Sequence, residues 1–234
     1  MKENIKYGVS QTLPLLPGFL ALGIAYGLAM QQAGFGMFWP AVVSLVADAG
    51  SMQFVMISFL KGGVGLLEAA LVTLSVNFRH VFYGLSFLQK YREMGKAYPY
   101  MIFSLTDETY SLQCNLKVPE GLDEKQVRLF LSISNHCYWV TGSLLGSLIG
   151  EMITFDITGI DFSMTALFVT IFVEQWREAK THLPAIIGLV CGGVFLFLLG
   201  PDGFLLPALV CSVMVLIFGK PVILRQEREG RKGA

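Results

Sequence analysis

The sequence has few charged residues, and the charges that it has cancel. Only 15% of its 234 residues are Asp, Glu, Lys or Arg, and 17 basic residues stand against 17 acidic ones. A chain without net positive charge lacks the electrostatic footprint of a nucleic-acid-binding protein. It also has too little polar surface for a soluble domain, since 54% of its residues are hydrophobic and its mean hydropathy is +0.61. The composition therefore predicts an integral membrane protein.

Motifs of several other function classes are also missing. The chain has no GxxxxGK[ST] sequence of an ATPase, no HExxH and no GxSxG of hydrolases. Its four cysteines have no CxxC spacing, which is typical of packing residues rather than of a metal site or a disulfide framework. We expect no cofactor and no metal ion, and an enzyme embedded in the membrane is the least favoured function class.

Apolar segments fill most of the chain, and each approaches the length of roughly twenty residues that a helix needs to cross a bilayer. They cover residues 8–31, 38–60, 64–89, 98–116, 128–150, 160–176, 183–199 and 203–219. We expect an all-α integral membrane protein, a polytopic helical bundle with about six to eight hydrophobic segments. Residues 1–219 would form a single transmembrane permease domain, followed by a basic tail at 220–234.

The distribution of charged residues predicts on which side of the membrane the two termini lie. The basic tail is expected on the cytoplasmic side and the acidic stretch at 151–161 outside, so both termini would be cytoplasmic. The amino terminus lacks the features of a removable signal peptide. Eight simple crossings would place the basic residues Lys90 to Lys96 outside, against the usual excess of Lys and Arg in cytoplasmic loops. We therefore expect some segments to be broken or re-entrant.

Three segments contain residues that interrupt helices. Pro14 and Pro17 lie early in the first segment, Asp48-Ala49-Gly50-Ser51 in the second and Thr106-Asp107-Glu108-Thr109 in the fourth. Unwound backbone at membrane depth is tolerated only where it is buried in protein or lines a cavity. Each break therefore marks a candidate pathway.

Glycines recur four residues apart in several segments, and this spacing lets a neighbouring helix approach closely. The glycines are Gly23, Gly27, Gly142, Gly146, Gly150, Gly188 and Gly192. We expect them to serve helix packing.

Polar side chains inside apolar segments are the candidate functional residues, because a charge at the bilayer centre costs about 2.5–3.5 kcal/mol. Free amide groups after a break at Gly50 would suit a carboxylate, and an acid would suit an ammonium group. Candidates for substrate binding are Gly50, Ser51, Gln53, Asn77, Asp107 and Glu108. Candidates for proton coupling or gating are Asp48, Arg79, His80 and His136.

Each candidate also has a structural alternative. Arg79 could reach lipid phosphates from near a membrane end. Asp48 could cap a helix, and His136 could be a satisfied packing residue. Asn77 and His80 share one helix face and could form an interhelical hydrogen bond, while the two acids at 107–108 could simply be solvated.

Several motifs in a fixed order resemble the AzlC family, the large subunit of the azaleucine-resistance or branched-chain amino acid export permeases. The resemblance covers nearly the whole chain. Its motifs are the Pro-Gly segment leading to Gly23-Ile24-Ala25-Tyr26-Gly27, then Ala49-Gly50-Ser51-Met52-Gln53-Phe54, Asn77-Phe78-Arg79-His80 with Tyr83-Gly84, Thr106-Asp107-Glu108, and Gly159-Ile160-Asp161-Phe162 before Ala166-Leu167-Phe168.

The resemblance implies a multi-pass permease of the bacterial inner membrane that exports branched-chain, hydrophobic amino acids with a small AzlD-type membrane subunit. Asp48 departs from the family pattern, in which an apolar residue is usual, so a role for it would be particular to this chain or structural. The alternatives are an exporter or facilitator of another small solute, or a structural membrane subunit.

Overall fold

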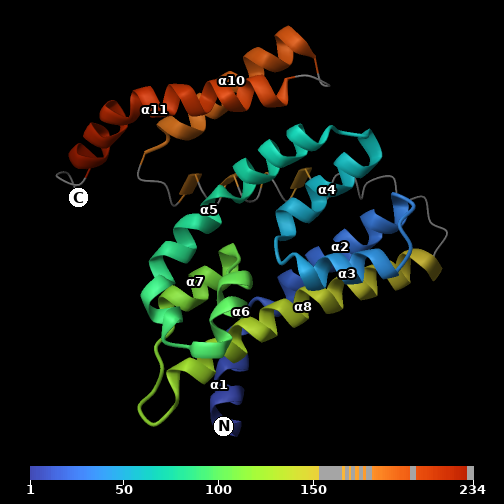
Figure 1. The fold of residues 1–234 in the computed structure, drawn as a ribbon, viewed down its shortest axis with the longest axis vertical. Helices are drawn as coiled ribbons and strands as arrows, with labels where there is room; N and C mark the ends of the chain where they lie inside the picture. The colour runs from blue at the N-terminus through green and yellow to red at the C-terminus, as the bar shows by residue number, and fades with distance from the viewer. Residues whose placement is uncertain are drawn as a thin grey trace. The chain divides into compact units, whose positions relative to one another are not determined.

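The computed structural model describes residues 1–152, 181–200 and 204–230, together with 165–166, 169, 172–173 and 176–177. The chain divides into two compact units, one of Met1–Ala69 with Thr73–Met164 and one of Ala70–Val72 with Thr165–Ala234. Every regular element in the described ranges is a helix (Figure 1). The all-α prediction is confirmed to this extent.

The first unit contains eight α-helices and one short 3-10 helix in its described part. They are α1 (Lys2–Thr12), α2 (Leu16–Gln32), α3 (Phe38–Val46), α4 (Gly50–Gly62), α5 (Leu66–Arg92), η1 (Gly95–Ala97), α6 (Tyr98–Phe103), α7 (Asp107–Asn115) and α8 (Glu124–Met152). Residues 70–72 of α5 group with the second unit.

All three expected interruptions separate two helices. The chain turns between α1 and α2 by 68° around Pro14, which has no backbone N–H to donate. The second break lies at residues 47–49, where Ala47 and Ala49 have φ of −137° and −145° and so leave the helical region. The third lies at residues 104–106, and Thr106 caps α7 by accepting a hydrogen bond from the amide of Thr109.

The lengths of the described helices differ from the expected spans. Among them, no single helix has both the length and the apolar composition that a membrane crossing requires, whereas the bent pair α1 and α2 meets both conditions together.

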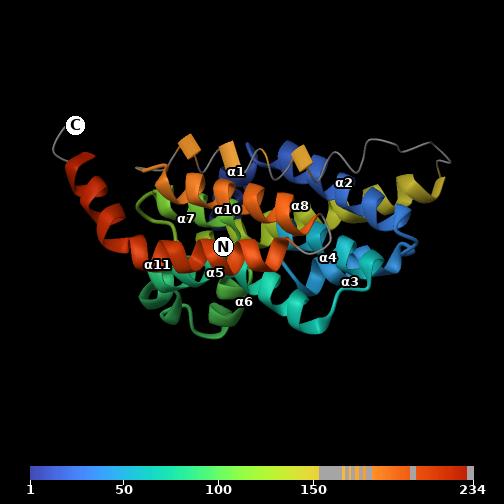
Figure 2. The ribbon, with the colours of Figure 1, turned by 90° about the horizontal axis from the view of Figure 1, so that it is seen from above.

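The glycines expected to serve packing bring α2 and α8 into close contact. A Cβ atom added to Gly27 would lie 2.1 Å from the carbonyl oxygen of Ser143, and one added to Gly146 would lie 2.1 Å from that of Ile24. Gly23 and Gly142 meet in the same way one turn earlier. Figures 1 and 2 both show α8 running alongside α2. The packing role predicted for these glycines is confirmed.

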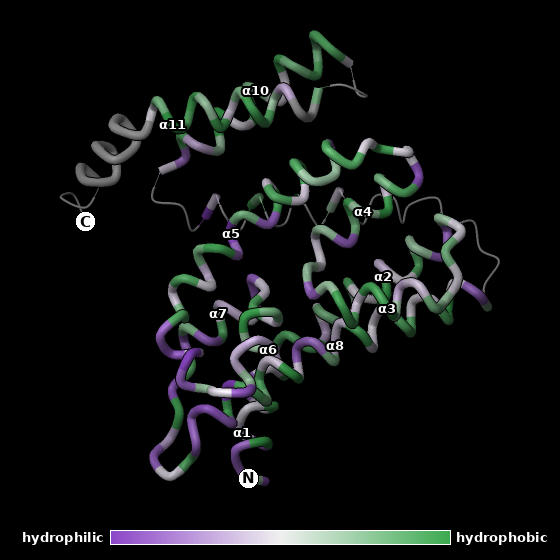
Figure 3. The backbone as a smooth tube through the Cα atoms, in the orientation of Figure 1, coloured by the Kyte–Doolittle hydropathy of each residue, from purple (hydrophilic) through white to green (hydrophobic). Residues whose placement is uncertain are grey.

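Apart from the contact between α2 and α8, apolar side chains form a hydrophobic core where α5, α6 and α7 meet. Its buried members are Phe87, Tyr91, Met101 and Leu105. The Phe87 and Tyr91 rings stack with centroids 5.0 Å apart. Hydrophilic residues of this unit gather instead at the end that holds the N terminus and the loop between α7 and α8 (Figure 3).

The described part of the second unit includes α10 (Leu183–Leu199) and α11 (Leu205–Gly230), which lie side by side in Figures 1 and 2. The helix α11 continues past residue 219, where the apolar segment was expected to end. Gly188 and Gly192 meet no atom within 4 Å in the described residues and line a cavity of about 610 Å³. The expected segment 160–176 and loop 151–161 lie mostly outside the described residues.

Candidate functional site

One face of α8 holds the helix breaks of the first unit in place. Its residues from Asn135 to Ser143 donate or accept hydrogen bonds to α3, α4, α6 and α7. Backbone that leaves a helix needs new hydrogen-bond partners when it is buried. The helix α8 therefore acts as a common support for both broken segments.

The α3–α4 break is fastened by Gln53 and Trp139. The Gln53 amide nitrogen donates to the carbonyl oxygen of Ala47, and its oxygen accepts from Trp139 Nε1 at 3.0 Å. Gly50 lies so close to the Trp139 ring that an added Cβ would be 2.9 Å from it. Both ends of the Gln53 amide thus have partners, and a side chain at position 50 would collide with the Trp139 ring.

His136 joins the end of α3 to α6. Its Nε2 is 3.0 Å from the carbonyl oxygen of Ser44, and its Nδ1 is 3.1 Å from the hydroxyl of Tyr100. A carbonyl oxygen can only accept, so Nε2 donates to Ser44; Nδ1 accepts from Tyr100 when the imidazole is neutral. Ser44 Oγ also donates to Ser143 Oγ at 2.8 Å. His136 is buried and satisfied, as its structural alternative predicts.

The α6–α7 break is supported by Asn135, which is 1% exposed. Its amide nitrogen donates to Thr109 Oγ1 at 3.1 Å, next to the Thr106 cap. Its amide oxygen is buried and has no hydrogen-bond partner among the described residues. An unmet buried acceptor is uncommon in a protein interior and favours a place for water or a ligand donor.

Arg79 and Asp107, both singled out from the sequence, form an ion pair. Arg79 Nη2 lies 2.8 Å from Asp107 Oδ2 and donates to Ser51 Oγ at 3.0 Å. Tyr83 donates to Asp107 Oδ1 at 2.8 Å. The pair connects α5 to the first turns of α4 and α7, and its side chains are 21% and 31% exposed.

A partly open cavity of about 450 Å³ lies against the α3–α4 break. Apolar side chains dominate its lining, among them Met52, Met56 and Phe59 from α4. Asn77 and Gln53 add polar groups. The amide oxygen of Asn77 is buried and has no hydrogen-bond partner within the described part of the chain.

The predicted site residues therefore fall into two neighbouring groups. Gln53 and Asn77 line the cavity, whereas Ser51, Arg79 and Asp107 form the ion-pair cluster. The first turn of α4 lies between them, because Ala49 and Met52 face the cavity and Ser51 is bound by Arg79.

The remaining candidates lie near these groups. The His80 ring meets the Tyr83 ring edge-on at 5.6 Å. Asp48 is within electrostatic reach of His136 and of Glu108. The proposed coupling roles of Asp48, Arg79, His80 and His136 stay predictions.

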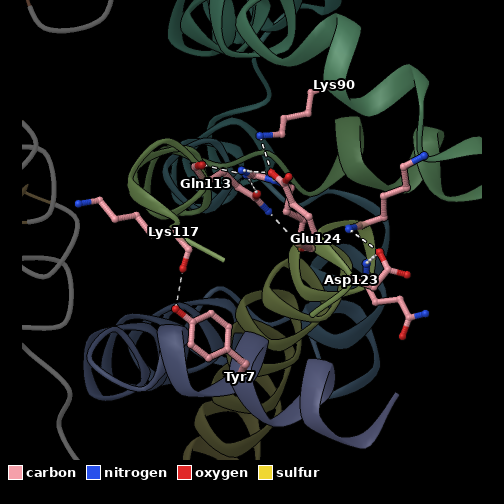
Figure 4. A network of polar contacts seen from close by, with 9 residues as sticks. Tyr7, Lys90, Gln113, Lys117, Asp123 and Glu124 are labelled. Carbon is pink, nitrogen blue, oxygen red and sulfur yellow. Dashed lines mark hydrogen bonds and ion pairs between the residues drawn. The ribbon is translucent and has the colours of Figure 1, made fainter. Parts of the chain in front are cut away.

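A separate polar network closes the hydrophilic end of this unit (Figure 4). The buried Arg128 donates to the backbone and side-chain oxygens of Gln113 at 2.9 and 2.6 Å and pairs with Glu124 at 2.8 Å. Glu124 also pairs with Lys90 at 2.5 Å. These contacts join α5, α7 and α8 away from the cavity.

Several structural contributors were not among the candidate site residues chosen from the sequence. Trp139, Asn135 and Tyr83 bind the broken segments, and Met52, Met56 and Phe59 line the cavity. Large apolar residues inside apolar segments carry no local signal that separates a cavity wall from a packed core. The polar members did carry a signal, since a buried Asn or Tyr needs a partner.

A sequence profile described as AzlC protein matches residues 14–153. The Branched-chain amino acid transport protein AzlC of Bacillus subtilis is 42% identical over 212 residues, 90% of this chain and 84% of the relative. An uncharacterized membrane protein of Haemophilus influenzae is 39% identical over 92% of this chain and 88% of the relative. One of Helicobacter pylori is 39% identical over 92% and 94%. No solved structure matches this chain.

Proposed function

Because this chain belongs to the AzlC family, we propose that it is a permease that exports branched-chain amino acids across the bacterial inner membrane. The name of the Bacillus subtilis relative supports amino acid transport rather than catalysis, and the other two relatives are named membrane proteins. Export direction and a small AzlD-type subunit are parts of this proposal.

The cavity beside the α3–α4 break is the observation that carries the proposal. Its volume of about 450 Å³ falls in the range of roughly 300–1,000 Å³ that is usual for small-molecule sites. Its apolar wall, with Met52, Met56 and Phe59, suits a branched aliphatic side chain. Asn77 adds a polar group to this lining, and its amide oxygen has no hydrogen-bond partner among the described residues.

The position of this cavity also suits a transporter. Substrate sites in many transporters lie where helices are discontinuous, because half-helices can move and their ends bind charged groups. Here the cavity lies against the residues that separate α3 and α4. A change in the break would therefore alter the cavity directly.

A cavity-filling variant tests this proposal. Ala69 lines the cavity, whereas the next residue, Ala70, is exposed. We expect Ala69→Phe to slow the efflux of valine from preloaded cells by about tenfold or more, because a phenyl ring occupies the space for the side chain. Ala70→Phe is the matched control and should leave efflux near the wild-type rate.

The measurement is the loss of labelled valine from cells at equal protein level, with the AzlD-type subunit present. Wild-type cells that lose valine no faster than cells without the protein would end the proposal of branched-chain export. Equal efflux in both phenylalanine variants would instead move the substrate site away from this cavity.

A further inference from the structure

The ion pair of Arg79 and Asp107 joins the starts of two half-helices. Ser51, the second residue of α4, and Asp107, the first residue of α7, both contact the same Arg79 nitrogen, at 3.0 and 2.8 Å. Each half-helix follows a break in the chain. A single guanidinium group therefore holds both broken segments to α5.

This guanidinium group retains an unused donor. Arg79 Nε is buried and has no hydrogen-bond partner among the residues that the structure describes. The matching acceptor for a guanidinium fork is a carboxylate, which can take two parallel hydrogen bonds. Asp107 supplies one carboxylate, and its second oxygen is held by Tyr83 at 2.8 Å.

Opening this pair is costly unless a ligand replaces both partners. Each side chain is largely covered, with 21% of Arg79 and 31% of Asp107 exposed, so a charge left alone would lose its compensation without full access to water. A carboxylic acid could satisfy only Arg79, and an amine only Asp107. A zwitterion carries both complementary groups at once.

We infer that the Arg79–Asp107 ion pair recognises the zwitterionic head of an α-amino acid, whose carboxylate binds Arg79 and whose ammonium binds Asp107 in exchange for the internal pair. This inference rests on the proposed function, because the ligand is its substrate.

Replacement of the internal ion pair by the charged groups of the ligand also connects recognition of these groups to the cavity. Neither Arg79 nor Asp107 lines the cavity in this state, and the first turn of α4 lies between them and it. Replacing the Arg79 contacts releases Ser51 and so frees this turn to move. The ion pair then acts as a latch that opens for a ligand with both charges.

The first test compares three ligands of similar shape on the purified wild-type protein with its partner subunit. Valine carries both charges, α-ketoisovalerate only the carboxylate, and isobutylamine only the ammonium group. We expect valine to bind at least about tenfold more tightly than either analogue, as measured by calorimetry. A single-charge analogue that binds within about twofold of valine would overturn the inference, and this result needs no variant to fold.

The second test uses neutral variants of each partner. Asp107→Asn should reduce the preference for valine over α-ketoisovalerate by about tenfold, and Arg79→Gln should do the same for the preference over isobutylamine. Glu120→Gln, at an exposed loop residue of the same unit, is the control and should keep both ratios.

A purely structural pair would weaken the three ligands equally in both variants, and that result would overturn the inference. It would leave export intact as a proposal if wild-type cells still release valine. Wild-type cells that release no valine would remove the proposed function and the inference together.

Discussion

At the scale of single residues, Glu124 couples the hydrophilic end of the first unit to pH. Its carboxylate contacts Lys90 at 2.5 Å and Arg128 at 2.8 Å, and these hydrogen bonds hold its pKa below the ordinary value (Figure 4). A lowered pKa in the folded state stabilises the fold above the unfolded-state pKa, and this contribution is lost as pH falls through the folded-state pKa.

We therefore expect Glu124→Gln to be less stable than wild type at about pH 7, with the difference shrinking as the pH falls below the ordinary pKa of 4.5 and vanishing below the lowered pKa of the folded state. The side chain is 47% exposed, so solvent screening limits the effect to about 1 kcal/mol or less. Thermal unfolding of the detergent-purified protein across this pH range measures it. Glu120→Gln, at an exposed loop residue, is the control, and a deficit that persists in acid would contradict the explanation.

At the scale of helices, the crossing of α2 and α8 depends on residues without side chains. The Cβ of an alanine at position 146 would lie 2.1 Å from the backbone oxygen of Ile24, so the two helices must separate. We expect Gly146→Ala to lower the free energy of unfolding by about 1–3 kcal/mol. Urea or thermal unfolding in detergent gives this value.

Gly84→Ala provides the matched control for that helix crossing. Gly84 lies within α5, and an added Cβ meets no described atom within 4 Å. Alanine is a better helix former than glycine by about 1 kcal/mol, so Gly84→Ala should be neutral or stabilising. Equal losses in both variants would mean that glycine flexibility, rather than close approach, is what the α2–α8 crossing requires.

The helices also show which structural features could be predicted from the sequence and which could not. The breaks follow from local residue types, such as Pro14 before α2 and Asp48-Ala49-Gly50 at the start of α4, and these were predicted. The partners of the broken backbone are distant, since Gln53 is 86 residues from Trp139 and Ser44 is 92 from His136. Local periodicity contains no information about such pairings.

The candidate site likewise has features that the sequence predicted and features that it did not. Arg79 and Asp107 were both selected because charges within apolar segments are expensive, but their pairing required the packing of α5 against α7. Asn77 and Arg79 lie only two residues apart on α5, and the structure places them at the cavity and at the ion pair respectively. Which apolar residues form the cavity wall depended on the break angle, which residue types do not determine.

At the scale of the whole molecule, large apolar side chains remain exposed. Leu67 of α5 is 75% exposed and Phe197 of α10 is 91% exposed. Extended apolar surface on a protein indicates contact with lipid or with another protein. Both surroundings agree with the proposed membrane permease, and a small membrane subunit would cover part of this surface.

We predict that co-expression with an AzlD-type subunit increases valine efflux several-fold over this chain alone, because the subunit covers apolar surface and stabilises the transporting fold. The subunit should also co-purify with the chain. Ala69→Phe is the informative control, since a filled cavity should stop efflux while leaving the subunit bound. A chain that exports valine equally well without the subunit would contradict the prediction and leave lipid as the covering of these surfaces.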